Sequence, residues 1–274
     1  MKSLDSKSNS HEINGYFDEH GRCIPNSLTK PVYKTSRRYF LCEQPRIDYR
    51  RILENINQYL NEGQPTISPG DFEERCQGIM DNLVADPLTK NIRLGVHVPF
   101  VLPQREYTDI GNDLDSIFLP AVHRSFEGMF PDRAFVNHSS RQLAGSIEVQ
   151  EGSRHRELIE ENCEKTVVGL YFPCLSEYSI PAAVEQLGSL PKNLVLAGGY
   201  DTCAAFVACP DLLLRLSGYP PLLWMTGIRG HQDGFGYQFE AYGYNLTFNR
   251  RAHLGKVAEY WSSGLICTEQ NCSS

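Results

Sequence analysis

The sequence predicts an α+β or mixed α/β fold, with a helical first half and a second half centred on a β-sheet. Apolar residues recur at helical spacing in two segments before residue 90, and apolar stretches typical of strands recur after residue 166. An aromatic ladder after Gly234 predicts an antiparallel hairpin. Together these observations place the helices early in the chain and the sheet late.

Two helices are expected in the first half. The first follows Pro45, carries an apolar stripe from Tyr49 to Leu60, and ends before Gly63. The second begins at Ser68, which can accept hydrogen bonds from free amide groups of the first turn, with proline at the next position. It ends near Asp86, because a residue before proline disfavours the helical conformation.

Strands and further helices are expected after this helical pair. Ile92–Leu102 alternates apolar and polar residues, the period of a half-buried strand, whereas the near-continuous apolar run Thr166–Pro173 is typical of a fully buried strand. Ser179 should cap a short helix that reaches Leu187. Further along, Asp201 should cap a helix over 202–209, and Pro210 should begin another that reaches Gly218.

The aromatic ladder contains a change of parity. Phe235, Tyr237 and Phe239 share one face, and the apolar positions shift between Phe239 and Tyr242. One extra residue moves every later side chain to the opposite face of a strand. A turn or bulge near 241–243 is therefore expected.

Length and charge limit the class of protein. The chain has 274 residues and a formal net charge of −7, which disfavours nucleic-acid partners. We expect residues 1–30 to form a flexible arm and residues 31–274 a single globular domain, with a subdivision possible near 140–165. No apolar run is long enough to span a membrane, no secretory signal is recognisable, and the nine cysteines lack a disulfide framework. These features favour a soluble cytoplasmic protein with free thiols and no membrane partner; they do not indicate an oligomeric state.

One hydrophobic core is expected to join the predicted elements of the second half. Their apolar faces contribute the following residues: Val168, Leu170, Phe206, Leu213, Leu223, Trp224, Tyr237 and Phe239.

Two cysteines are candidate nucleophiles. Cys203 lies in the first turn of the helix after Gly198, where the positive end of the helix dipole lowers a thiol pKa. Cys174 directly follows a strand, a common position for site residues. Burial as small apolar residues is the alternative interpretation of both.

A polar loop over 229–234 is a second candidate site. Arg229, His231 and Asp233 bring a cation, an imidazole and a carboxylate together within five residues. A solvated hairpin loop would have the same composition. If the protein has a pocket, we expect its lining to include five residues of the second half: Asp201, Arg229, His231, Asp233 and Glu240.

These candidates favour a non-catalytic protein that binds a small polar molecule or a protein, without a cofactor or a metal. No nucleophile–base pair or metal set can be assembled from the sequence with specificity. The alternative is a cysteine-dependent hydrolase or transferase that uses Cys203 or Cys174 with His231 and Asp233. Whether the protein is an enzyme stays open at this stage.

Residues 194–248 resemble part of a family of bacterial proteins of unknown function, found mostly in actinobacteria. The resemblance is carried by Cys209-Pro210-Asp211-Leu212-Leu213 and by Pro221-Leu222-Leu223-Trp224-Met225-Thr226-Gly227. It implies a bacterial, cytosolic origin and no particular reaction.

Overall fold

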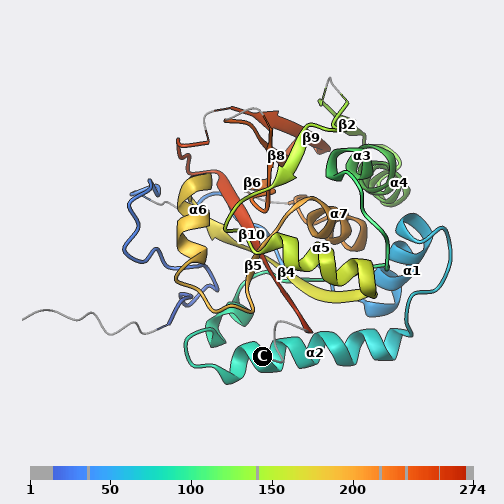
Figure 1. The fold of residues 1–274 in the computed structure, drawn as a ribbon, viewed down its shortest axis with the longest axis horizontal. Helices are drawn as coiled ribbons and strands as arrows, with labels where there is room; N and C mark the ends of the chain where they lie inside the picture. The colour runs from blue at the N-terminus through green and yellow to red at the C-terminus, as the bar shows by residue number, and fades with distance from the viewer. Residues whose placement is uncertain are drawn as a thin grey trace, which may run out of the picture.

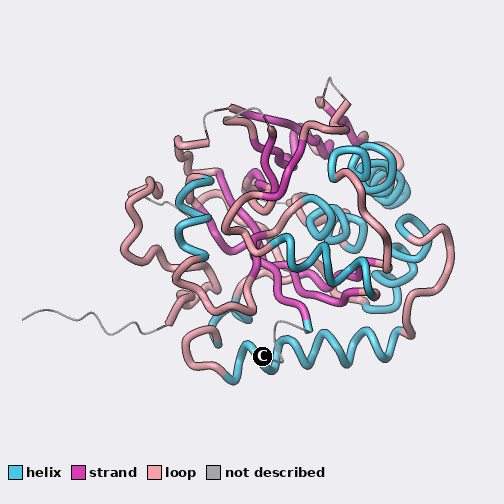
Figure 2. The backbone as a smooth tube through the Cα atoms, in the orientation of Figure 1, coloured by secondary structure: helices cyan, strands magenta, loops and turns pink. Residues whose placement is uncertain are grey.

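The computed structural model describes residues 15–35, 38–139, 142–215, 218–231, 234–252 and 254–269. Strands run through the middle of the molecule and helices lie around them (Figure 2). The helices are α1 (Tyr49–Leu60), α2 (Pro69–Ala85), the 3-10 helix η1 (Lys90–Leu94), α3 (Ile110–Asp113), the π-helix η2 (Leu114–Phe118), α4 (Leu119–Met129), α5 (His155–Glu164), α6 (Ile180–Leu187) and α7 (Gly199–Ala208).

Most of the strands lie after residue 130, as the sequence predicted. They are β1 (Val98–Leu102), β2 (Phe135–Asn137), β3 (Ile147–Val149), β4 (Val167–Ser176), β5 (Val195–Leu196), β6 (Leu222–Trp224), β7 (Ile228–Gly230), β8 (Gly236–Tyr242), β9 (Asn245–Arg251) and β10 (Trp261–Thr268). The main sheet has the order β1-β4-β10-β6-β8-β9-β2, and β5 also pairs with β10. β3 and β7 form a separate small sheet. The α+β class is therefore confirmed.

The two early helices begin and end where the sequence placed them. Asp48 caps α1 by accepting a hydrogen bond from the Arg51 amide, and Ser68 caps α2 by accepting one from the Asp71 amide. Helix α7 packs against β1 and β4, and α1 and α4 pack against α7 (Figure 1). Helix α2 contacts β4 and α1.

Three local expectations need correction. The segment 92–102 is a strand only from Val98, because Lys90–Leu94 forms η1. Asp201 does not precede helix α7; it is the third residue of that helix, and its carboxylate accepts hydrogen bonds from the Gly198 amide. Residues 210–213 form turns in place of a helix, and two residues of the expected helix, 216 and 217, lie outside the described residues.

The aromatic hairpin is present. β8 and β9 pair antiparallel, and the turn between them contains Gly243 and Tyr244, both with positive φ (57° and 69°). Such a pair of left-handed residues is typical of the tight turns that join hairpin strands. Phe239 contacts Phe206 of α7, with ring centroids 4.4 Å apart, so the hairpin packs onto the core.

One hydrophobic core extends from Phe17 to Cys267. It contains all of the predicted core residues except Trp224, which is buried in a smaller cluster with Trp261. Residues 15–30, expected to belong to a flexible arm, instead pack on the body, since Phe17 and Cys23 are buried in this core. Residues 1–14 of the expected arm lie outside the described residues. Within the described part, no helix has the length and apolarity to cross a membrane.

Candidate functional site

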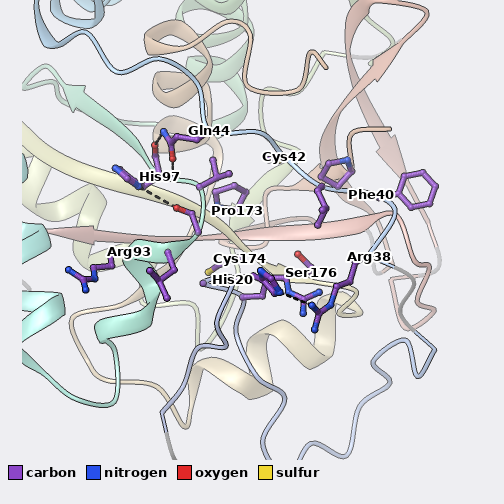
Figure 3. A pocket seen from close by; sticks show the side chains of 17 residues that line it. His20, Arg38, Phe40, Cys42, Gln44, Arg93, His97, Pro173, Cys174 and Ser176 are labelled. Carbon is purple, nitrogen blue, oxygen red and sulfur yellow. Dashed lines mark hydrogen bonds between the residues drawn. The ribbon is translucent and has the colours of Figure 1, made fainter. Parts of the chain in front are cut away.

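A cavity of about 510 Å³ opens where two N-terminal segments cross the start of β1 and the end of β4. Such a volume lies within the range of small-molecule sites. The lining comes from five parts of the chain: residues 20–22, residues 38–44, residues 93–97, the end of β4, and Pro221 before β6 (Figure 3). None of these segments carries a residue that the sequence analysis proposed for a pocket, and Cys174 is the candidate nucleophile among them.

The first segment, residues 15–24, is here called the N-terminal strap. The Asp18 carboxylate holds its turn by accepting hydrogen bonds from the amides of His20 and Arg22 and from the Arg22 guanidinium. Gly21 has a φ of 71° and passes so close to the backbone of Gly95 that a Cβ at Gly21 would lie 2.2 Å from the Gly95 nitrogen. Only glycine fits this crossing, which fixes the strap over residues 93–97.

The second segment, residues 38–44, is fixed at its far end by Gln44. The Gln44 amide nitrogen donates to the His97 carbonyl at 2.9 Å, and the His97 amide donates to the Gln44 side-chain oxygen at 2.9 Å. This reciprocal pair places the His97 ring in the cavity wall, above Phe172 of β4. Burial lowers the pKa of His97, so its ring is mostly neutral at pH 7.

The charged side chains in the lining are cationic. The lining contains Arg22, Arg38 and Arg93, and neither an aspartate nor a glutamate. This is the opposite sign to the net charge of −7 of the whole chain. A concave surface lined by one sign of charge concentrates ligands of the other sign.

The three arginines differ in their partners. Arg22 is paired with Asp18 at 2.6 Å, and Arg38 donates to the His20 ring at 2.7 Å and lies 3.8 Å from Glu19. Arg93 is exposed and has no hydrogen-bond or ion-pair partner among the described residues. Arg93 is therefore the cation in the lining that is most available to a ligand.

The floor of the cavity is apolar. Pro173, Cys174 and Pro221 belong to the lining and are here called the apolar floor; burial raises the pKa of the Cys174 thiol well above its usual range. The Cys42 thiol, also in the lining, has its pKa raised to about 12 by burial. Both groups are neutral thiols at pH 7, so the floor complements an apolar part of a ligand.

The second-half residues proposed from the sequence do not come together in this cavity. Asp201 is fully buried beside His155, with Asp201 Oδ1 3.6 Å from His155 Nδ1. Glu240 pairs with Arg251 on the hairpin at 3.1 Å. Asp233 lies outside the described residues.

Arg229 and His231 do lie near each other, because both contact Glu148 of β3. The Arg229–Glu148 distance is 2.7 Å and the His231–Glu148 distance is 3.3 Å. His231 also lines a smaller hollow of about 180 Å³ with Arg250. The carboxylate of Glu148 is thus a partner that the sequence analysis did not identify.

Cys203 lies in the interior of the protein. It is fully buried in α7, and burial raises its pKa well above the usual range, opposite to the expected effect of the helix dipole. Among the described residues, no hydrogen bond joins the sulfur of Cys203 or of Cys174 to His231. The described cysteines are free thiols, as their spacing predicted.

Sequence reasoning missed the residues of the cavity and the role of His155. His155, which the sequence analysis did not select, is fully buried against Gly198. His20 and Arg22 fall in the expected flexible arm, and Arg93 in the expected strand. Their common position depends on the crossing of Gly21 and Gly95, which no local pattern encodes.

Comparison with family models, with curated proteins and with solved structures finds no match for this chain. Among the described residues, no group of three or more histidine, cysteine, aspartate or glutamate side chains is placed to hold a metal ion.

Proposed function

We propose that the protein binds a small organic anion in the cavity under the N-terminal strap. The observation that carries the proposal is the sign of the lining: it holds three arginines and no carboxylate, in a chain of net charge −7, and Arg93 has no partner among the described residues. Guanidinium groups bind carboxylates and sulfonates through charge-assisted hydrogen bonds, which are stronger than neutral ones.

The apolar floor supports an organic ligand over an inorganic ion. Pro173 and Pro221 offer no side-chain hydrogen bonds, and the thiol of Cys174 is only a weak donor. A bare phosphate would leave this surface uncovered, whereas a carboxylate or sulfonate with an apolar body fills both parts of the cavity. This refines the non-catalytic binding role that the sequence favoured.

The first test uses anilinonaphthalene sulfonate, an aromatic anion that becomes fluorescent in apolar sites. We expect saturable binding to the wild type, and affinity about fivefold weaker for Arg93→Gln, which corresponds to about 1 kcal/mol for one exposed ion pair. The matched control is Arg156→Gln, an exposed arginine outside the lining. The binding should also weaken as salt is raised from low to physiological concentration.

The neutral analogue N-phenylnaphthylamine separates anion recognition from simple hydrophobic binding. We expect it to bind more weakly than the sulfonate and to be insensitive to Arg93→Gln. Equal affinity for the two probes, or equal effects of Arg93→Gln and Arg156→Gln, would show that the cavity does not select anions and would refute the proposal.

A further inference from the structure

We infer that the anion bound in the cavity carries a long apolar tail, so that the ligand class is a long-chain carboxylate. This inference rests on the proposed function and concerns the part of the ligand that lies outside the arginines. It is drawn from the distribution of exposed apolar side chains around the cavity.

Exposed large apolar side chains gather at the cavity mouth. Leu94 and Leu41 belong to the lining and are 52% and 36% exposed. Tyr39 and Tyr219, which are 50% and 55% exposed, contact the ring of the lining residue Phe40. Exposed apolar side chains that cluster beside a cavity mark a binding site more often than an isolated apolar residue does.

Three aromatic side chains form an ordered surface beside the cavity, here called the aromatic shelf: Tyr39, Phe40 and Tyr219. The rings of Tyr39 and Tyr219 stack with centroids 5.2 Å apart, and Phe40 lies 6.1 Å from Tyr219. The shelf is held by the backbone, because the Leu41 amide donates to the Tyr219 carbonyl at 3.2 Å. Phe40 itself lines the cavity, so the shelf continues the cavity wall outward (Figure 3).

The cavity thus combines cations, an apolar floor and, through Phe40, the apolar shelf. Figure 3 shows Arg93 and Arg38 on opposite sides of the close view, with Arg38 on the side of Phe40. A short anion would engage the cations and leave the shelf in contact with water. A carboxylate with a long tail would cover the shelf and gain the free energy of burying apolar surface.

The test displaces anilinonaphthalene sulfonate with hexanoate, octanoate and decanoate. Each added methylene should raise the affinity about threefold, a gain slightly smaller than that of a completely buried methylene. Decanoate should therefore bind far more tightly than hexanoate. Equal affinities across the series would overturn this inference. Because the sulfonate itself would still bind through the arginines, the proposed function would stand.

Two variants localise the tail. Tyr39→Ser and Tyr219→Ser, two shelf residues outside the lining, should flatten the dependence on chain length while leaving hexanoate affinity within twofold of the wild type. Their controls are Leu88→Ser and Tyr242→Ser, exposed apolar residues outside the lining, which should keep the full dependence. If the controls flatten it equally, the tail does not lie on the shelf and the inference fails.

A membrane surface is the competing occupant of an apolar, cationic patch. Sedimentation with phosphatidylglycerol vesicles, which carry the anionic charge on a bilayer, separates the two sources. We expect the protein to stay in the supernatant, since the cationic groups line a concave site. Co-sedimentation that is lost in Tyr219→Ser would overturn the inference in favour of a lipid surface.

Discussion

The cavity and the buried pair His155–Asp201 both bring titratable side chains together, but with opposite consequences. In the cavity, Arg38 and His20 are about half exposed, and Arg93 is exposed, so the arginines keep their charge in contact with water. In the buried pair, burial lowers the pKa of His155 to about 4 and raises the pKa of Asp201 to about 7. The comparison teaches that a cluster of titratable residues indicates a ligand only where solvent can reach its charges.

The largest expected effect concerns the buried pair. Between about pH 4 and 6.5, folded Asp201 holds a proton that the unfolded chain has released, because its pKa is raised from 3.8 to about 7. Its contribution to the free energy of unfolding therefore decreases as the pH rises. Folded His155 lacks a proton that the unfolded chain holds, because its pKa is lowered from 6.5 to about 4, so its contribution increases as the pH rises. In the wild type, these two opposite dependences of the free energy of unfolding on pH cancel.

Single substitutions should expose the two slopes. Relative to the wild type, the free energy of unfolding of His155→Gln should fall by about 3 kcal/mol from pH 4 to pH 7. That of Asp201→Asn should instead fall by about 3 kcal/mol as the pH decreases from 6.5 to 4. Urea unfolding at a series of pH values measures both. Slopes that neither substitution changes would contradict this account, because Asp201 and His155 would then hold the same protons in the folded and the unfolded chain.

The next effect concerns the crossing that forms the cavity. Gly21→Ala should reduce the free energy of unfolding by about 3 kcal/mol, because alanine adds a clash with the Gly95 backbone to the cost of a positive φ. It should also weaken binding of anilinonaphthalene sulfonate, since the strap forms one wall of the cavity.

Gly63→Ala provides the matched control for that substitution. Gly63 has a similar φ of 79°, but no atom lies within 4 Å of an added Cβ. Gly63→Ala should reduce the free energy of unfolding, measured by thermal or urea unfolding, by about 1 kcal/mol and leave probe binding unchanged. Equal costs at the two glycines would mean that the strap can move away from residues 93–97 freely.

Local signals explain which parts of the fold were predictable. The caps at Asp48 and Ser68, the apolar period of α1, and the parity change before Gly243 all depend on residues within one or two turns of each other. The cavity depends on contacts between residues far apart in sequence, such as Gly21 with Gly95 and Gln44 with His97. The burial of His155 was not predictable for a similar reason, since it depends on Gly198 and Asp201 beyond its own helix.

The smallest effect concerns the loop that the sequence analysis preferred as a site. Arg229 pairs with Glu148, and the two side chains are 41% and 35% exposed, respectively. Solvent therefore screens their attraction. Arg229→Ala should reduce the free energy of unfolding by about 0.5 kcal/mol and leave sulfonate binding unchanged. Titration of the probe against this variant checks it. A loss of sulfonate binding as large as that of Arg93→Gln would show that the anion binds at this loop and not in the cavity.

A crystal structure of the protein with decanoate tests the central claim most directly. We expect the carboxylate within hydrogen-bond distance of Arg93 or Arg38 in the cavity of about 510 Å³, and the tail over the aromatic shelf. Decanoate bound beside His231 and Arg250, or an empty cavity at a concentration that saturates the protein in solution, would contradict the account.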